Sequence, residues 1–108
     1  MAPQELLLVV FCLVDDEVKA LGGPPRRPGP RPRLADSEVI TIELVGELWG
    51  LADDAAILRH VRAHHLAEFP ALAGVDRTRF ARQAADLCWL KRALQRRLAG
   101  HLPGLRGV

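Results

Sequence analysis

Arginine dominates the chemistry available to this chain. Thirteen of its 15 Lys and Arg residues are Arg, whose planar guanidinium suits the recognition of phosphate and carboxylate. Four of them, Arg26, Arg27, Arg31 and Arg33, lie in a segment that is rich in proline. An extended basic arm of this kind can enter the minor groove of DNA or follow its phosphates. A GC-rich coding sequence, which writes Arg in place of Lys, would produce the same bias.

A second basic segment opens a predicted helix near the C-terminus. The stretch DRTRFARQ brings Arg77, Arg79, Arg82 and Gln83 into two helical turns. A recognition helix presents its N-terminal residues to base edges, with Arg reading guanine and Gln reading adenine. This favours DNA as the partner, although a solvated helix face would look the same. With two arginines further along the same side, the candidate DNA-binding residues are Arg26, Arg27, Arg31, Arg33, Arg77, Arg79, Arg82, Gln83, Arg92 and Arg96.

Two pairs of adjacent carboxylates, Asp15-Asp16 and Asp53-Asp54, are candidates for acid–base or metal chemistry. Such chemistry needs carboxylates that converge from different elements, whereas neighbours on one helix diverge. We therefore interpret Asp53-Asp54 as a helix cap and Asp15-Asp16 as the solvent side of the first helix.

Three histidines form a further cluster, at His60, His64 and His65. The first two are four residues apart, which is the spacing of a two-histidine metal pair on a helix. No glutamate of an HExxH motif and no third ligand at a suitable spacing accompanies them, so a surface cluster is expected. No known nucleophile motif and no glycine-rich phosphate loop is present either. The sequence therefore predicts no catalytic residue, no metal site and no cofactor.

Charge is distributed unevenly along the 108 residues, although the formal net charge is only +2. Residues 36–75 hold two Lys or Arg against seven Asp or Glu, whereas residues 76–108 hold eight against two. This asymmetry favours an anionic partner for the C-terminal third of the chain.

Helix signals recur at four places and no stretch alternates over the length of a strand, which predicts an all-α fold, a small bundle of about four helices. The helices are expected over residues 3–21, 36–50, 53–66 and 76–99. Five prolines and three glycines within residues 22–33 predict an extended linker after the first helix. The expected organisation is an N-terminal apolar helix (1–21), a Pro/Gly/Arg linker arm (22–35), a helical DNA-binding-like domain (36–102) and a tail (103–108).

The second and fourth helices carry specific expectations. Asp36 should cap the second helix, and Glu43 and Glu47 should belong to an acidic outer surface that would repel a DNA backbone. The fourth helix should run unbroken to Ala99. Lys91 falls in the middle of its apolar face, which is tolerable only if the side chain snorkels to solvent.

The two cysteines, Cys12 and Cys88, sit in apolar stretches without a C-x-x-C pattern. We expect buried free thiols in a reducing cytoplasm. The nine apolar residues from Leu6 to Val14 are too few to span a bilayer, and they lack the flanks of a secretion signal. A cytoplasmic chain with no membrane partner is therefore expected.

Several stretches together resemble a known family. These are LVVFCLVDDEVKAL, RPGPRPRLADSEVITIELVGELWG, FPAL and RTRFARQAADLCWLKRALQRRLA. They resemble the N-terminal region of bacterial insertion-sequence (IS) DDE transposases of the IS4-like group, most like the family conventionally numbered nine-eighty-two. The resemblance extends to about Leu102, and its specific parts are the blocks DSEVITIELVGE and RTRFARQ. Ala35 departs from the pattern, because a Ser or Thr there would form a capping box with Glu38, a loss that Asp36 can cover.

The resemblance implies a helical region that helps to bind the inverted repeats at transposon ends. In the family, a metal-dependent catalytic domain with an RNase H-like fold follows and performs DNA transposition. No acidic triad maps onto this chain, so the resemblance implies a truncated transposase that binds double-stranded DNA and is not itself an enzyme.

Two other functions remain open from the sequence. The apolar first helix and Trp89 could pair with a second copy or with a full-length transposase, which would make the chain an oligomerisation module. The chain could also be a non-functional relic of a mobile element.

Overall fold

Five α-helices and one short 3-10 helix form the described part of the chain. The computed structural model describes residues 2–22, 29 and 32–98. Within these residues there is no strand, so the predicted all-α fold is confirmed. In chain order the elements are α1 (Pro3–Ala20), α2 (Asp36–Leu48), α3 (Asp54–His64), the 3-10 helix η1 (Pro70–Gly74), α4 (Arg77–Asp86) and α5 (Cys88–Leu98).

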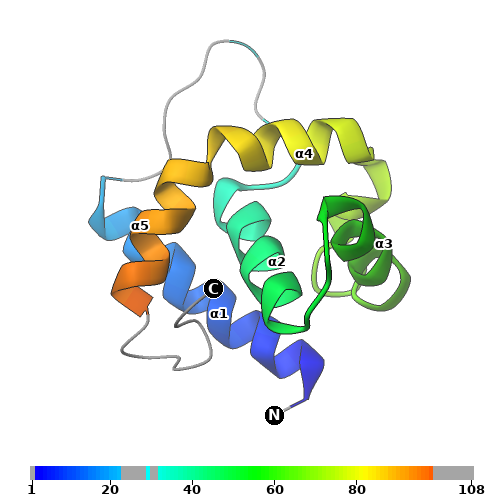
Figure 1. The fold of residues 1–108 in the computed structure, drawn as a ribbon, viewed down its shortest axis with the longest axis horizontal. Coiled ribbons are helices and arrows are strands. Elements are labelled where there is room, and N and C mark those ends of the chain that lie inside the picture. The colour runs from blue at the N-terminus through cyan, green and yellow to red at the C-terminus, as the bar shows by residue number, and fades with distance from the viewer. Residues whose placement is uncertain (1, 23–28, 30–31, 99–108) are drawn as a thin grey trace.

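Helix α2 occupies the centre of the fold (Figure 1). It contacts α1, α3 and α4, while α5 contacts α1 and α4. Ten of its 13 residues are buried, so it has no solvent face of the usual amphipathic kind. This burial arises because other helices cover α2 from several directions.

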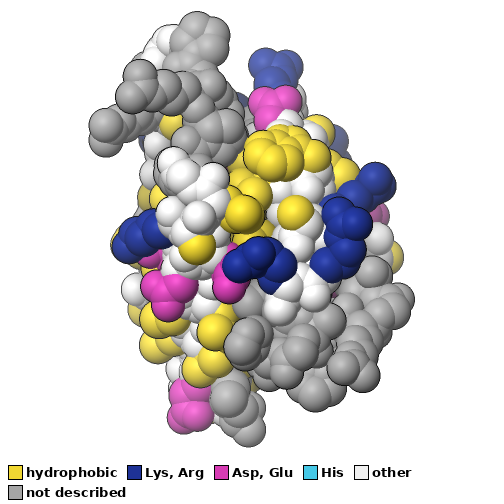
Figure 2. All heavy atoms as spheres, turned by 90° about the vertical axis from the view of Figure 1, so that its left-hand side faces the viewer, with side chains coloured by type: hydrophobic (Ala, Val, Ile, Leu, Met, Phe, Trp, Pro, Cys, Tyr) yellow, Lys and Arg dark blue, Asp and Glu magenta, His cyan; other side chains and the backbone are white. Residues whose placement is uncertain are grey.

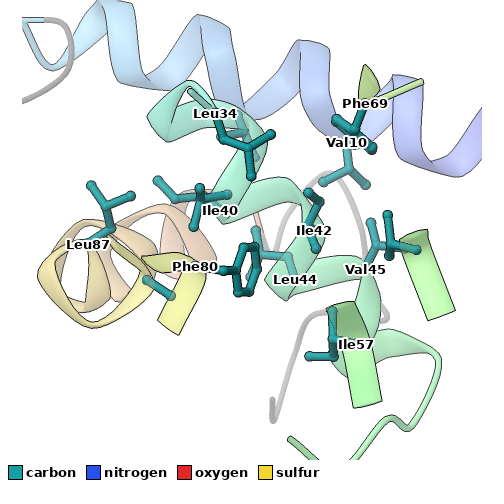
Figure 3. Close-up of a cluster of buried hydrophobic side chains, with 14 of the residues drawn as sticks. Val10, Leu34, Ile40, Ile42, Leu44, Val45, Ile57, Phe69, Phe80 and Leu87 are labelled. Carbon is teal, nitrogen blue, oxygen red and sulfur yellow. The ribbon is translucent and has the colours of Figure 1, made fainter. Parts of the chain in front are cut away.

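Hydrophobic side chains from the surrounding elements converge on α2 (Figure 3). Val10 of α1, Ile57 of α3 and Phe80 of α4 are each at most 3% exposed. Leu34, which precedes α2, is also fully buried. These contacts supply the apolar burial that stabilises the bundle. The α2 residues drawn with them are Ile40, Ile42, Leu44 and Val45.

A glycine allows α3 to approach α2 closely. A Cβ atom on Gly46 would lie 2.6 Å from Cγ1 of Ile57, well inside van der Waals contact. Helix α3 begins as predicted, because the Asp53 side chain accepts a hydrogen bond of 2.8 Å from the Ala56 amide. The interpretation of Asp53-Asp54 as a cap is therefore confirmed for Asp53.

Helix α1 carries apolar residues on two faces, and only one of these faces is buried. Its buried residues follow a helical spacing and are Leu7, Val10, Val14 and Val18. The opposite side exposes Leu8, Val9 and Cys12. Cys12 and Cys88 are both free thiols, but the predicted burial of Cys12 is wrong because its side chain points away from α2. No helix in the described residues is both long and apolar enough to cross a membrane.

Asp15 of α1 helps to fix α2 rather than lying only toward solvent. Its carboxylate accepts a hydrogen bond of 2.9 Å from the Ser37 hydroxyl and forms an ion pair of 2.8 Å with Lys19. The hydrogen bonds from Lys19 and Ser37 hold the pKa of Asp15 below its ordinary value. The predicted solvent role of this residue is therefore corrected, because a buried serine on α2 uses it as a partner.

The start of α2 differs from the prediction by one residue. The N-cap is Ala35, and the Glu38 carboxylate accepts a hydrogen bond of 2.9 Å from the Ala35 amide. Asp36 is the first helical residue and its side chain is buried. Asp36 therefore does not act as the N-cap, because the Glu38 contact fixes the helix boundary before it.

The predicted fourth helix is divided into α4 and α5. The break lies at Leu87, whose amide donates to the Gln83 and Ala84 carbonyls while its carbonyl accepts from the Lys91 amide. A straight helix over residues 76–99 would be about 36 Å long, and the longest extent of the molecule is 35 Å. The break lets α4 cover α2 and α3 and turns α5 toward α1 (Figure 1).

Lys91 reaches carboxylates of α2 instead of solvent. Its Nζ lies 2.6 Å from Glu47 Oε1 and 3.5 Å from Glu43 Oε1. Gln95 adds a hydrogen bond of 3.4 Å to the Glu47 carboxylate. Glu43 is only 8% exposed, so assigning it to an acidic outer surface is wrong. Lys91 interrupts the apolar face of its helix because it pairs with this buried carboxyl group.

The buried Glu43 carboxyl has an unusual protonation equilibrium. Burial raises its pKa from 4.5 to about 8, and a hydrogen bond with Asp54 adds to the rise. The charge of Lys91 acts in the opposite direction but does not outweigh burial. For Lys91, burial opposes the charged form, but the hydrogen bond and charge of Glu47 and the charge of Glu43 leave its pKa raised.

We expect Glu43 to contribute a fall in the free energy of unfolding as pH rises from about 4.5 to 8. In this window folded Glu43 keeps a proton that the unfolded chain has released, so the slope is negative, at most about 1.4 kcal/mol per pH unit. Urea unfolding across this range should show that Glu43→Gln removes the negative contribution. Glu5→Gln, at an exposed position of α1, is the matched control and should keep it. A pH profile unchanged in Glu43→Gln would refute the assignment.

Candidate nucleic-acid interface

The proline-rich arm is only partly described. Arg26, Arg27 and Arg31 lie outside the described residues. Arg33 is exposed, and its Nη1 donates a hydrogen bond of 3.1 Å to the Gly74 carbonyl. A Cβ atom on Gly74 would lie 2.1 Å from that nitrogen. Arg33 is therefore held against the end of η1, and the absence of a side chain at Gly74 makes room for it.

Helix α4 presents the predicted arginines to solvent. Arg77, Arg79 and Arg82 are all exposed. The opposite face of the helix packs into the core through Phe80 and Ala84, which are buried. Arg79 lies 3.7 Å from the Asp76 carboxylate, but both side chains are more than half exposed, and such pairs are worth little. The three guanidiniums are therefore accessible to an external anion.

Gln83 takes part in packing between helices. Its Nε2 donates hydrogen bonds of 3.0 Å to the Leu34 carbonyl and 2.9 Å to the Asp36 carboxylate. These bonds tie α4 to the beginning of α2. The amide protons that would read adenine are therefore used inside the protein. Sequence reasoning missed this role because both acceptors lie more than 40 residues away.

Helix α5 extends the basic surface. Arg92 and Arg96 are exposed, one turn apart. Arg97 forms an ion pair with Glu17 of α1, so part of its charge is compensated. The largest exposed apolar side chain nearby is Trp89, at 61% exposure. Figure 2 shows hydrophobic side chains bordered by Lys or Arg side chains on the side of the molecule where α5 lies.

Uncompensated positive charge is the common property of these arginines. Within the described part of the chain, Arg77, Arg82, Arg92 and Arg96 have no Asp or Glu side chain within 4 Å. The acidic residues of α2 that could have opposed them are instead directed toward Lys91. The surface over α4 and α5 therefore offers cations to an anionic partner.

Two hollows lie between α3 and α4. One has a volume of about 400 Å³ and includes Arg59, Arg62 and Arg77 in its lining. The other is about 690 Å³ and is lined by Asp53, Asp54, Ala55, Arg77, Thr78, Ala81 and Arg82. Sequence reasoning did not select Arg59 and Arg62. Their spacing of three residues on one helix was a usable signal, but their proximity to Arg77 depends on the tertiary fold.

Two of the three histidines, His60 and His65, contact Trp49 just past the end of α2, and His64 lies against both of them. The His65 ring stacks on the indole with centroids 5.5 Å apart, and the His60 ring meets it edge-on at 5.2 Å. Burial lowers the pKa of His60, and the charges of His64 and His65 lower it further. His65 is only 6% exposed, so the expectation of a surface cluster is wrong for this residue. No group of three or more His, Cys, Asp or Glu side chains that could hold a metal ion occurs in the described residues.

Comparisons with known proteins assign no function to this surface. No protein-family model, curated protein or solved structure matches the chain. Membership of a transposase family, which the resemblance implied, therefore stays a prediction. The observations that bear on function are therefore the exposed arginines of α4 and α5.

The structural role of Gln83 can be separated from the surface role of its neighbour. Gln83→Ala should lower the free energy of unfolding by about 1 kcal/mol or more, because buried Asp36 loses a donor. Arg82→Ala, one residue earlier and exposed, should change it by no more than about 0.5 kcal/mol. Urea denaturation followed by circular dichroism measures both. Equal stability of the two variants would contradict the contact between α4 and the start of α2.

Proposed function

We propose that this chain binds double-stranded DNA through the arginines of α4 and α5. The observation that supports the proposal is the group of exposed guanidiniums without carboxylate partners, at Arg77, Arg82, Arg92 and Arg96. DNA carries a dense row of phosphates, and arginine binds phosphate in bidentate geometry. Transposon ends are the target that the sequence resemblance points to.

The local charge matters more for this function than the total charge. The net charge of +2 is too small to draw the whole chain to DNA. The acidic groups of α2 are instead paired with Lys91, as in the 2.6 Å contact to Glu47. A backbone approaching α4 and α5 therefore meets mainly cations. Asp53 and Asp54 border the hollow at the start of α4, so the approach is favoured on the outer side of the two helices.

The predicted contacts divide into two kinds. Arg79 and Arg82 lie in the first two turns of α4 and are proposed to reach base edges. Arg92 and Arg96 of α5 are proposed to bind phosphates. Arg26, Arg27 and Arg31 remain assigned to the DNA backbone by sequence alone. Gln83 is left out of the contact set, because its amide is bonded to Leu34 and Asp36.

Self-association is a second candidate function, supported by a separate observation. Leu8 is 54% exposed and Val9 is 38% exposed on the outer side of α1, next to the exposed Cys12. Trp89 of α5 is also exposed. Apolar side chains that lie together on a surface often mark an interface. A second copy of this chain, or a full-length transposase, would cover them.

DNA binding is tested by fluorescence anisotropy with a short duplex at several salt concentrations. The affinity should fall steeply with salt, with a log–log slope of about −0.9 for each phosphate contacted. The variant Arg79→Ala/Arg82→Ala should bind roughly 10-fold or more weakly, since each arginine at a base edge is worth about 1–3 kcal/mol. Lys19→Ala, which removes one charge from α1, is the control and should bind like the parent. Absence of binding at low salt would reject the proposal.

Self-association is tested by light scattering over a range of protein concentrations. The mass should rise above that of one chain as concentration increases, because burial of Leu8 and Val9 favours a complex. Leu8→Asp should return the mass to one chain. Leu21→Asp, at an exposed leucine just past the end of α1, should leave the association intact. A mass of one chain at every concentration would exclude this function for the chain alone.

A further inference from the structure

The hollow between α3 and α4 has the composition of an anion site. Its lining residues are Ala55, Leu58, Arg59, Arg62, Ala63 and Arg77. Arg59 and Arg62 lie one turn apart on α3, and Arg77 is the first residue of α4. Three arginines thus line a space of about 400 Å³ that has no Asp or Glu in its lining. We propose that this hollow binds a phosphate group.

Arg62 is the fixed member of the group. Its Nη2 donates a hydrogen bond to the Val75 carbonyl and a longer one, of 3.4 Å, to the Leu72 carbonyl. These neutral acceptors orient the guanidinium but leave its charge uncompensated. Its Nε is buried and has no hydrogen-bond partner among the described residues. Buried polar groups without partners are rare, so the Arg62 guanidinium is not fully satisfied within the described residues.

The other two arginines add mobile charge beside this fixed group. Arg59 and Arg77 are exposed, and within the described residues neither makes an ion pair. Like charges gathered around one hollow repel each other, and a bound anion would remove that repulsion. Guanidiniums are also suited to bidentate contacts with the oxygens of a phosphate.

The charges near the start of α4 indicate where in the hollow the phosphate binds. Arg77 begins the 10-residue helix α4, whose N-terminus carries a partial positive charge. The Asp76 carboxylate is occupied by the Arg79 amide at 2.8 Å. Asp53 and Asp54 line the neighbouring hollow, on the other side of Arg77. The phosphate is therefore expected between Arg59, Arg62 and Arg77, away from the two aspartates.

This site adds a specific contact to the proposed function. It rests on that function for the source of the phosphate, which is the DNA backbone. A DNA backbone that lies along α4 and α5 would place one phosphodiester in the hollow and so fix the register of the duplex. A free phosphate ion would satisfy the same guanidiniums. The chemistry of the site is common to both sources, and only experiment distinguishes them.

The first experiment measures inorganic phosphate binding to the full chain. Phosphate is titrated at constant ionic strength while the arginine Nε–Hε resonances and the thermal midpoint are followed. We expect saturable shifts and a rise in the midpoint, both lost in Arg59→Ala/Arg77→Ala. Both positions are exposed, so this variant should remain folded. Lys19→Ala, which removes one exposed charge from α1, is the control and should respond like the parent. Responses that persist without Arg59 and Arg77 would overturn the site.

The second experiment repeats the DNA titration with Arg59→Ala/Arg77→Ala and with the Lys19→Ala control. If the hollow holds a backbone phosphate, Arg59→Ala/Arg77→Ala should lower the salt slope by about 1 to 2. If this variant binds DNA like the parent but has lost phosphate binding, the source is free phosphate and the backbone assignment falls. If the parent chain binds phosphate but no DNA, the proposed function fails and the anion site stands. If Arg59→Ala/Arg77→Ala keeps both the phosphate binding and the DNA salt slope of the parent, the site is rejected.

Discussion

The burial of α2 on nearly all sides is the constraint on which the rest of the structure depends. A helix that is covered in this way must find a partner for every polar side chain that it carries inside, because an unpaired buried group costs stability. Helices α1, α4 and α5 each supply such a partner. Asp15 of α1 accepts from Ser37, Gln83 of α4 donates to Asp36, and Lys91 of α5 reaches Glu47. The polar residues of α2 thus specify how the helices are arranged around it.

The same constraint shapes the outer surface. Lys91 turns inward, and it engages Glu47, which would otherwise oppose an anionic partner. The arginines of α4 and α5 remain outside with little compensation. Arginine keeps its charge at any physiological pH, so this surface does not depend on titration. A helix with acidic side chains at the centre and basic helices at the edge is therefore consistent with binding to phosphate.

Much of the fold follows from local sequence signals. Gly22, with φ of 103°, lies just past the end of α1, and Asp53 and Asp76 cap their helices as residues of this type usually do. The break at Leu87 has no local signal, because neither Gly nor Pro is near it. It results from the limited length of the core that α4 and α5 must cover together. Leu90, three residues beyond the break, is buried.

The site was only partly predictable for a related reason. Exposure of Arg79 and Arg82 follows from the period of the helix, which buries Phe80 and Ala84. The convergence of Arg59 and Arg62 with Arg77 requires the packing of α3 against α4. The internal role of Gln83 depends on acceptors at Leu34 and Asp36.

The partners of α2 also determine how the chain folds. Ser37 bonds to a residue 22 positions away, and Asp36 and Glu47 bond to residues 47 and 44 positions away. No pair of neighbouring helices can satisfy the central helix by itself. We therefore expect native order in this small bundle to be reached cooperatively, with the first and last helices ordering together. A change that loosens either end of the chain is felt at the centre.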